Sequence, residues 1–137
     1  MNRRNGRSAH LRLIGIGVVS LLAGATAAMA ADLAKEISTA AEHAELAATA
    51  TDVKMVKVHL HHTINCLVGP NSDSFDAKQL DPCKDFGDGA IPETTDAAKK
   101  KSLEGALAKA KSGLAADDLA AAQAIAAQAE TLIKAAM

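Results

Sequence analysis

Hydrophobic residues recur every three or four positions in four segments of the chain, which is the spacing of amphipathic helices. The predicted helices cover residues 32–50, 52–67, 94–112 and 116–136. Short turns join the first pair and the last pair, so the helices within each pair should pack antiparallel. The pattern therefore predicts an all-α protein, an up-down-up-down four-helix bundle with a long connection over residues 68–93.

The connection over residues 68–93 is rich in Gly, Pro, Asp and Ser, a composition typical of an irregular loop. We expect its four large apolar residues to pack it against one end of the bundle, namely Phe75, Leu80, Phe86 and Ile91. Its five aspartates do not follow the spacing of an EF-hand calcium loop. They are interpreted as turn residues exposed to solvent.

The ends of the predicted helices carry capping signals. Asp52 is expected to be the N-cap of the second helix, because a carboxylate there can accept from the free N–H groups of the first turn. Gly69, followed by Pro70, should end that helix. Gly113 is expected to end the third helix in the same way.

Residues 1–30 have the features of a secretory signal peptide. Several arginines precede an apolar run over residues 13–28, and Ala28-Met29-Ala30 fits a cleavage site. The run is shorter than the roughly 20 residues that a membrane-spanning helix needs. We therefore expect a single domain over residues 31–137 that is periplasmic or secreted and is not bound to a membrane after cleavage.

The net negative charge of residues 31–137 argues against two classes of partner, nucleic acids and anionic membranes. This part has 16 acidic residues, 11 lysines and no arginine. Nucleic acids and anionic membrane surfaces require a basic face, so neither is an expected partner. A protein partner in the periplasm remains compatible with this charge.

Two cysteines and a scarcity of aromatic residues affect the expected stability. The chain has no Trp or Tyr and only two Phe, so the core must consist of small aliphatic side chains. In an exported domain, Cys66 and Cys83 are expected to form a disulfide. Closing a loop of this length stabilises a fold by about 3 kcal/mol in the chain-entropy model.

The most chemically active side chains lie in the second predicted helix. On a helical wheel, Met55, His59, His62 and Cys66 form a stripe beside the apolar face. Counting back across the turn near residue 51 places His43 level with His59. Cys66 could bind an ion only if it stayed reduced, which export disfavours.

This stripe predicts a transition-metal site of His59 and His62, with His43 and Met55 assisting. Imidazole suits copper, nickel and zinc, and a thioether favours reduced copper, so copper is expected first and nickel or zinc next. The alternative interpretation is structural. Histidines on the flank of a bundle commonly bond to backbone or water, and a lone Met is commonly core filler.

Other cofactors and catalysis have little support in the sequence. A C-x-x-C-H attachment motif is absent and few aromatics could cradle a porphyrin, so no haem is expected. The chain also lacks a G-x-S-x-G motif and a glycine-rich phosphate loop. We therefore expect that the protein is not an enzyme.

The chain resembles the small metal-binding proteins of the bacterial periplasm. The resemblance lies in H-A-x-x-A at residues 43–47, HLHH at residues 59–62 and the alanine-rich tail over residues 107–130. It implies a histidine-bearing four-helix bundle that binds copper and other divalent ions. Members of that family carry histidines throughout, whereas the third and fourth predicted helices here have none, so a single defined site is expected.

Two functional hypotheses follow from the sequence. The first is a periplasmic protein that binds or buffers a transition metal, with copper the expected ion, through the His/Met stripe of the second predicted helix. The alternative is a non-enzymatic interaction or structural module that contacts another periplasmic protein through the loop over residues 68–93.

Overall fold

The computed structural model describes residues 31–137, and this part of the chain is entirely helical apart from its connections. The predicted all-α class is confirmed. The predicted signal peptide, residues 1–30, lies outside the described residues. Within residues 31–137, none of the helices combines the length and the apolar character that a membrane crossing requires.

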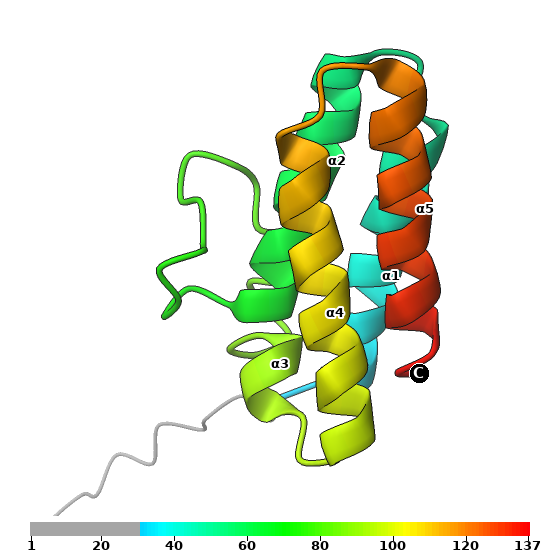
Figure 1. Ribbon diagram of the computed structural model, residues 1–137. Coiled ribbons are helices and arrows are strands. Elements are labelled where there is room, and N and C mark those ends of the chain that lie inside the picture. Colours follow the sequence, from blue (N-terminus) through cyan, green and yellow to red (C-terminus); the bar gives the residue numbers. More distant parts are fainter. Residues whose placement is uncertain (1–30) are drawn as a thin grey trace, which may run out of the picture.

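Four long helices lie side by side and a short one closes one end (Figure 1). The first helix, α1, packs against both α2 and α5, and α4 also packs against both of them. The four-residue helix α3 contacts α1, α2 and α4. The bounds are α1, Leu33–Thr49; α2, Val53–Val68; α3, Ala90–Glu93; α4, Ala97–Leu114; and α5, Leu119–Lys134.

The core between these helices is built mainly from alanine and a few larger aliphatic residues. Leu60 and Leu67 of α2, Leu103 of α4 and Ile133 of α5 are its large members. Around them lie fully buried alanines from three helices, so the helix backbones can approach closely. The buried face predicted for α2 is confirmed, since Val56, Leu60, Ile64 and Leu67 are all nearly inaccessible to solvent.

The two predicted caps of α2 are found, whereas the predicted end of the third helix was wrong. The Asp52 carboxylate accepts from the N–H of Met55 at 2.9 Å, and Gly69 is the C-cap with a φ of 68°. Gly113 instead lies inside α4, whose C-cap is Ala115. Gly113 is buried because α2 approaches closely there. A Cβ at this position would stand 2.5 Å from Cδ1 of Leu60.

The start of α4 also differs from the sequence-based expectation. The helix begins at Ala97 because the Asp96 side chain accepts from the N–H of Lys99 at 2.8 Å. The four residues of α3 are helical although the region was expected to be a loop. The sequence Ala-Ile-Pro-Glu gave no periodic signal because it is barely one turn long.

The connection between α2 and α3 is fixed to the bundle by covalent and polar contacts. Cys66 and Cys83 form the predicted disulfide, with 5.2 Å between their Cα atoms. The Asn65 side chain bonds to the backbone of Asp76 through both its oxygen and its nitrogen, and also to the carbonyl of Leu80. The loop is therefore anchored at the same end of α2 by two consecutive residues.

Three of the four apolar loop residues behave as expected. Phe75, Phe86 and Ile91 pack against the buried core. Leu80 does not, because 63% of its surface is exposed. Its carbonyl accepts from Asn65 while its side chain remains in solvent, so the contact made there is polar.

Candidate metal centre

Three histidines from the first two helices converge on the seam between them. His43 lies seven residues before Ala50, and His59 lies seven residues after Asp52, so the short turn between α1 and α2 brings them level. His62 follows His59 by almost one turn and therefore points to the same seam. Sequence reasoning predicted this group of three, and the structure places them together.

The distances within the cluster are close to those of a metal site. Nδ1 of His43 stands 3.3 Å from Nδ1 of His59, and one nitrogen from each of the three rings lies within 4.8 Å of the others. Two nitrogens bound to one zinc ion at 2.0–2.1 Å in tetrahedral geometry are about 3.3–3.4 Å apart. The His43–His59 pair, which is also within hydrogen-bond distance, already has this spacing, and a nitrogen of His62 lies within 4.8 Å of both rings' ligand atoms.

The three rings also lie close to one another. The His43 and His62 rings are perpendicular with centroids 4.9 Å apart, and the His59 and His62 rings cross at 88° with centroids 5.7 Å apart. Among residues 31–137, this is the single group of three or more His, Cys, Asp or Glu side chains so arranged.

Burial keeps two of the rings neutral near pH 7. Only 8% of His62 is exposed. Burial, followed by the nearby His43, His59 and His61, lowers the pKa of His62 to about 4. Burial and then His59 also lower the pKa of His43. A neutral imidazole has a free lone pair, which is the form that binds a metal.

His62 has an unsatisfied polar atom. Its Nδ1 is buried and has no hydrogen-bond partner among the described residues. Leaving a buried polar atom unpaired costs about 1–3 kcal/mol. The cluster offers one nitrogen from each of three imidazoles, and this donor set fits a transition metal.

The seam that holds the cluster is tightly packed. The hydroxyl of Thr63 donates to the carbonyl of His59 at 3.0 Å, and it lies 3.5 Å from the carbonyl of Ala40 on α1. Ala40 and Ala44 of α1 are fully buried. These small residues allow α1 and α2 to approach until their histidines meet.

The remaining predicted ligands have different surroundings. Met55 lies one turn before His59 and is 39% exposed, so its role as an assisting ligand stays a prediction. Cys66 has no free thiol because it is in the disulfide. His61 lies outside the cluster and pairs with the loop, its Nδ1 lying 3.4 Å from Oδ2 of Asp76.

Comparisons with known proteins yield no match for this chain. No family model, no curated protein sequence and no solved structure is significantly similar to it. The functional argument therefore rests on the geometry of the cluster. That geometry defines a helical protein whose first two long helices present a candidate three-histidine metal centre.

Proposed function

We propose that this protein is a periplasmic carrier or buffer of a transition metal, copper first and nickel or zinc as alternatives. His43, His59 and His62 supply the nitrogen ligands, and Met55 assists. The observation that carries the proposal is the convergence of three imidazoles, with one nitrogen from each ring within 4.8 Å of the others. In addition, Nδ1 of His62 is buried and has no hydrogen-bond partner among the described residues.

The chemistry of the cluster favours reversible binding. His43 and His62 are neutral near pH 7, so no proton must be displaced from either before an ion binds. All three rings come from two packed helices, so little reorganisation is needed. Imidazole ligands select copper, nickel and zinc over calcium and magnesium, and a thioether at Met55 adds preference for reduced copper.

The proposal also includes the compartment, the architecture and the absence of catalysis. The arginine-rich and apolar features of residues 1–30 support export, and the disulfide is compatible with an oxidising compartment. The pairwise packing of the four long helices supports an up-down-up-down bundle. The resemblance to small periplasmic metal-binding proteins belongs to the same proposal, which assigns the protein to carry or store an ion and not to transform a substrate.

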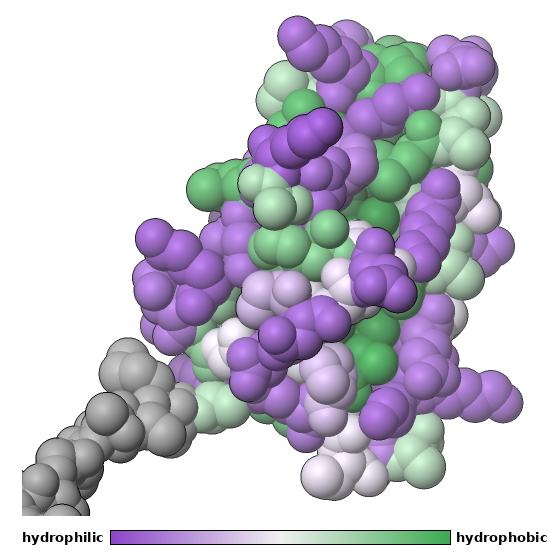
Figure 2. Space-filling model, turned by 90° about the vertical axis from the view of Figure 1, so that its left-hand side faces the viewer, coloured by the Kyte–Doolittle hydropathy of each residue, from purple (hydrophilic) through white to green (hydrophobic). Residues whose placement is uncertain are grey.

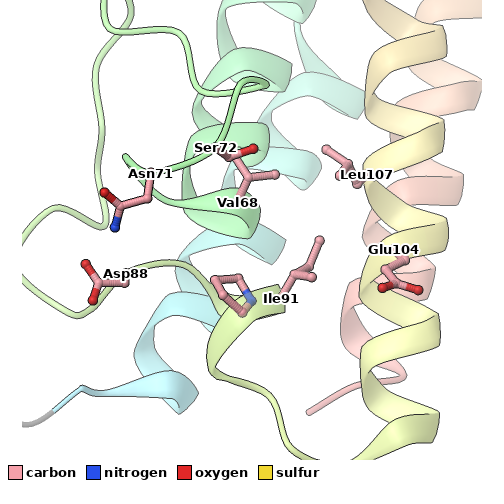
Figure 3. A pocket seen from close by; sticks show the side chains of 8 residues that line it. Val68, Asn71, Ser72, Asp88, Ile91, Glu104 and Leu107 are labelled. Atoms are coloured by element: carbon pink, nitrogen blue, oxygen red, sulfur yellow. The ribbon is translucent and has the colours of Figure 1, made fainter.

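The second candidate function, an interaction module, rests on a different observation. The loop after α2, together with α3 and α4, borders a pocket of about 570 Å³. Asp88 and Glu104 lie at its sides, while Ile91 and Leu107 point toward its centre (Figure 3). A partner that offers an apolar side chain beside a positive charge would match this lining.

Isothermal titration of the protein with Cu(II), Ni(II) and Zn(II) tests the metal proposal. One equivalent should bind with micromolar or tighter affinity, and His59→Ala should abolish this binding. His61→Ala is the matched control, because this neighbouring ring pairs with Asp76 outside the cluster. Binding no tighter than millimolar, with no change in His59→Ala, would leave only the interaction module.

A further inference from the structure

Two carboxyl groups, each with a buried oxygen, lie where α1, the loop before α3 and α3 itself meet. Glu36 of α1 is fully inaccessible to solvent. Its Oε1 accepts from the N–H of Gly89 at 2.9 Å, while its Oε2 has no hydrogen-bond partner among the described residues. A buried carboxylate without a cation or a full set of donors is strongly disfavoured.

The second carboxyl group comes from α3 and lies beside the first. One oxygen of Glu93 accepts from the N–H of Asp88, and its Oε2 is also buried and unpaired. Both carboxyl groups border the same glycine. A Cβ on Gly87 would stand within 3 Å of both oxygens of Glu93 and of Oε1 of Glu36. Gly87 therefore leaves room for both acidic side chains, whose oxygens lie around the same point.

We propose that Glu36 and Glu93 bind one proton between them and that the protonated pair fastens residues 87–93 to α1. Two adjacent carboxylates in a buried site cannot both ionise without strong repulsion. A single proton removes one charge and provides an O–H donor for the facing oxygen. We call residues 36, 87–89 and 93 the acid latch.

The acidic groups around the acid latch raise the pKa of Glu36. Burial raises the pKa of Glu36 first, and the charges of Glu93 and Asp88 raise it further, while the N–H of Gly89 opposes them. The resulting pKa is about 7. Lys84 and Asp85 line a second pocket, of about 280 Å³, that Glu93 also borders, so water and protons can reach the latch from that side.

The acid latch controls one wall of the larger pocket. Asp88, Ile91 and Pro92 belong to the fastened segment and line this pocket. Asp88 and Ile91 lie across the pocket from Glu104 and Leu107 of α4 (Figure 3). Above about pH 7 both carboxyl groups ionise and repel, so this wall loosens. The favourable contribution of the latch is complete below about pH 4.5 and is lost as the pH rises through about 7.

The experiment follows both the proton and the segment in the whole protein, with EDTA present so that the histidine cluster stays empty. Carbon-13 NMR of the glutamate carboxyl carbons from pH 4 to 9 should show one titration near pH 7. Hydrogen exchange of the amides of residues 87–93, corrected for intrinsic rates, should lose protection on the order of tenfold or more between pH 5.5 and 8.5.

Glu36→Gln provides the decisive variant. The amide accepts from Gly89 and donates to Glu93 without a proton, so protection of residues 87–93 should become independent of pH. Glu42→Gln, an exposed change on the same helix, should keep the wild-type response. If Glu36→Gln does not fold, Glu93→Gln tests the same pair from α3.

Three results would overturn the proposal. The first is titration of every glutamate between pH 4 and 5, and the second is an unchanged pH response in a folded Gln variant. The third is removal of the titration near pH 7 by millimolar CaCl₂ added without EDTA, which would assign the carboxyl pair to a cation. None of these results bears on metal binding by the histidines, so the two proposals fail independently.

Discussion

At the scale of single residues, His62 joins the two properties on which the candidate metal centre depends. It is the most buried of the three histidines, and its Nδ1 has no partner among residues 31–137. The burial that makes this ring a ready ligand also makes its protonation unfavourable. The empty protein should therefore be sensitive to acid through this one side chain.

We predict that the free energy of unfolding of the metal-free protein loses a contribution from His62 as the pH falls. The folded-state pKa is about 4, below the usual 6.5, so the contribution is present above pH 6.5 and is lost as the pH falls through about 4. The contribution of His62 to the free energy of unfolding is at most about 3 kcal/mol. Urea unfolding at pH 7 and 4.5 measures it, and His62→Gln should remove this part of the pH dependence.

The contribution of Glu36 to the free energy of unfolding has the opposite pH dependence. Wild type and His62→Gln must therefore be compared with each other at each pH. His61→Gln is the matched control because that ring is partly exposed and pairs with Asp76. An identical pH response in wild type and His62→Gln would show that protonation of His62 does not limit stability.

We predict that His43→Ala weakens metal binding by more than about 100-fold. Changes to groups that only support a ligand typically cost 10- to 100-fold, and a direct ligand should exceed this. His43 lies on α1, so the test asks whether both helices contribute to the site. Titration calorimetry measures the effect, and an affinity equal to that of wild type would confine the site to α2.

At the scale of helices, glycine has different roles at two positions of α4. A Cβ on Gly113 would meet Leu60 of α2 at 2.5 Å, whereas a Cβ on Gly105 would meet Leu132 at an ordinary 3.4 Å. Gly105 lies in the middle of α4 and Gly113 in its last turn, so the gain in helix propensity on change to alanine is larger at Gly105. They differ in the contact with the neighbouring helix.

We predict that Gly113→Ala destabilises the protein by about 1–2 kcal/mol through overpacking against Leu60. Gly105→Ala should stabilise it by about 0.5–1 kcal/mol, since alanine is the better helix former and space is available. Thermal or urea unfolding of both variants checks the pair. Equal stabilisation by the two changes would contradict this prediction. It would mean that α2 can move away from Gly113 of α4 without a loss in the free energy of unfolding.

We also predict that reduction of the Cys66–Cys83 disulfide lowers the free energy of unfolding by about 3 kcal/mol, given the 17-residue separation. Unfolding with and without a thiol reductant measures this. The three hydrogen bonds of Asn65 should keep the start of the loop near α2 after reduction. An unchanged stability would indicate that these polar contacts suffice.

The elements and the histidine cluster followed from the sequence because both depend on local regularity. Helical spacing located the four long helices, and one short turn fixed which residues of α1 and α2 lie level. The role of Gly113 could not be predicted from the sequence. The sequence alone does not distinguish a glycine buried at a contact between two helices from a glycine that ends a helix. The acid latch gave no signal either, because a glutamate one turn inside a helix is ordinarily a solvated residue near the positive end of the dipole.

At the scale of the whole molecule, the proposed binding of an ion would be linked to folding. The three histidines of the candidate centre come from two helices, so the unfolded chain cannot present them in the same arrangement. On the face in Figure 2, apolar and polar side chains are interleaved over the surface that carries the loop. The core beneath consists largely of alanine, and small side chains contribute little burial each. An added ion should therefore have a visible effect on stability.

We predict that a preferred metal at 100 times its dissociation constant raises the free energy of unfolding by about 2.7 kcal/mol. Differential scanning calorimetry should show a higher transition temperature, and EDTA should reverse the change. His59→Ala should unfold at the same temperature with and without the metal. A metal-induced rise that persists in this variant would locate the ion elsewhere.

The alanines behind the histidines have a consequence for selectivity. Ala40 and Ala44 have only a methyl group each at the α1–α2 seam, and both are fully buried. In the proposed site these methyl groups would act as spacers that set the distance between the histidines of α1 and α2, although they would not touch the ion. Exchange of one for glycine or valine would narrow or widen the gap between the helices, and with it the ionic radius and coordination geometry that the three nitrogens accept. The preference for one metal over another could then be changed at buried alanines, with all three histidines left in place.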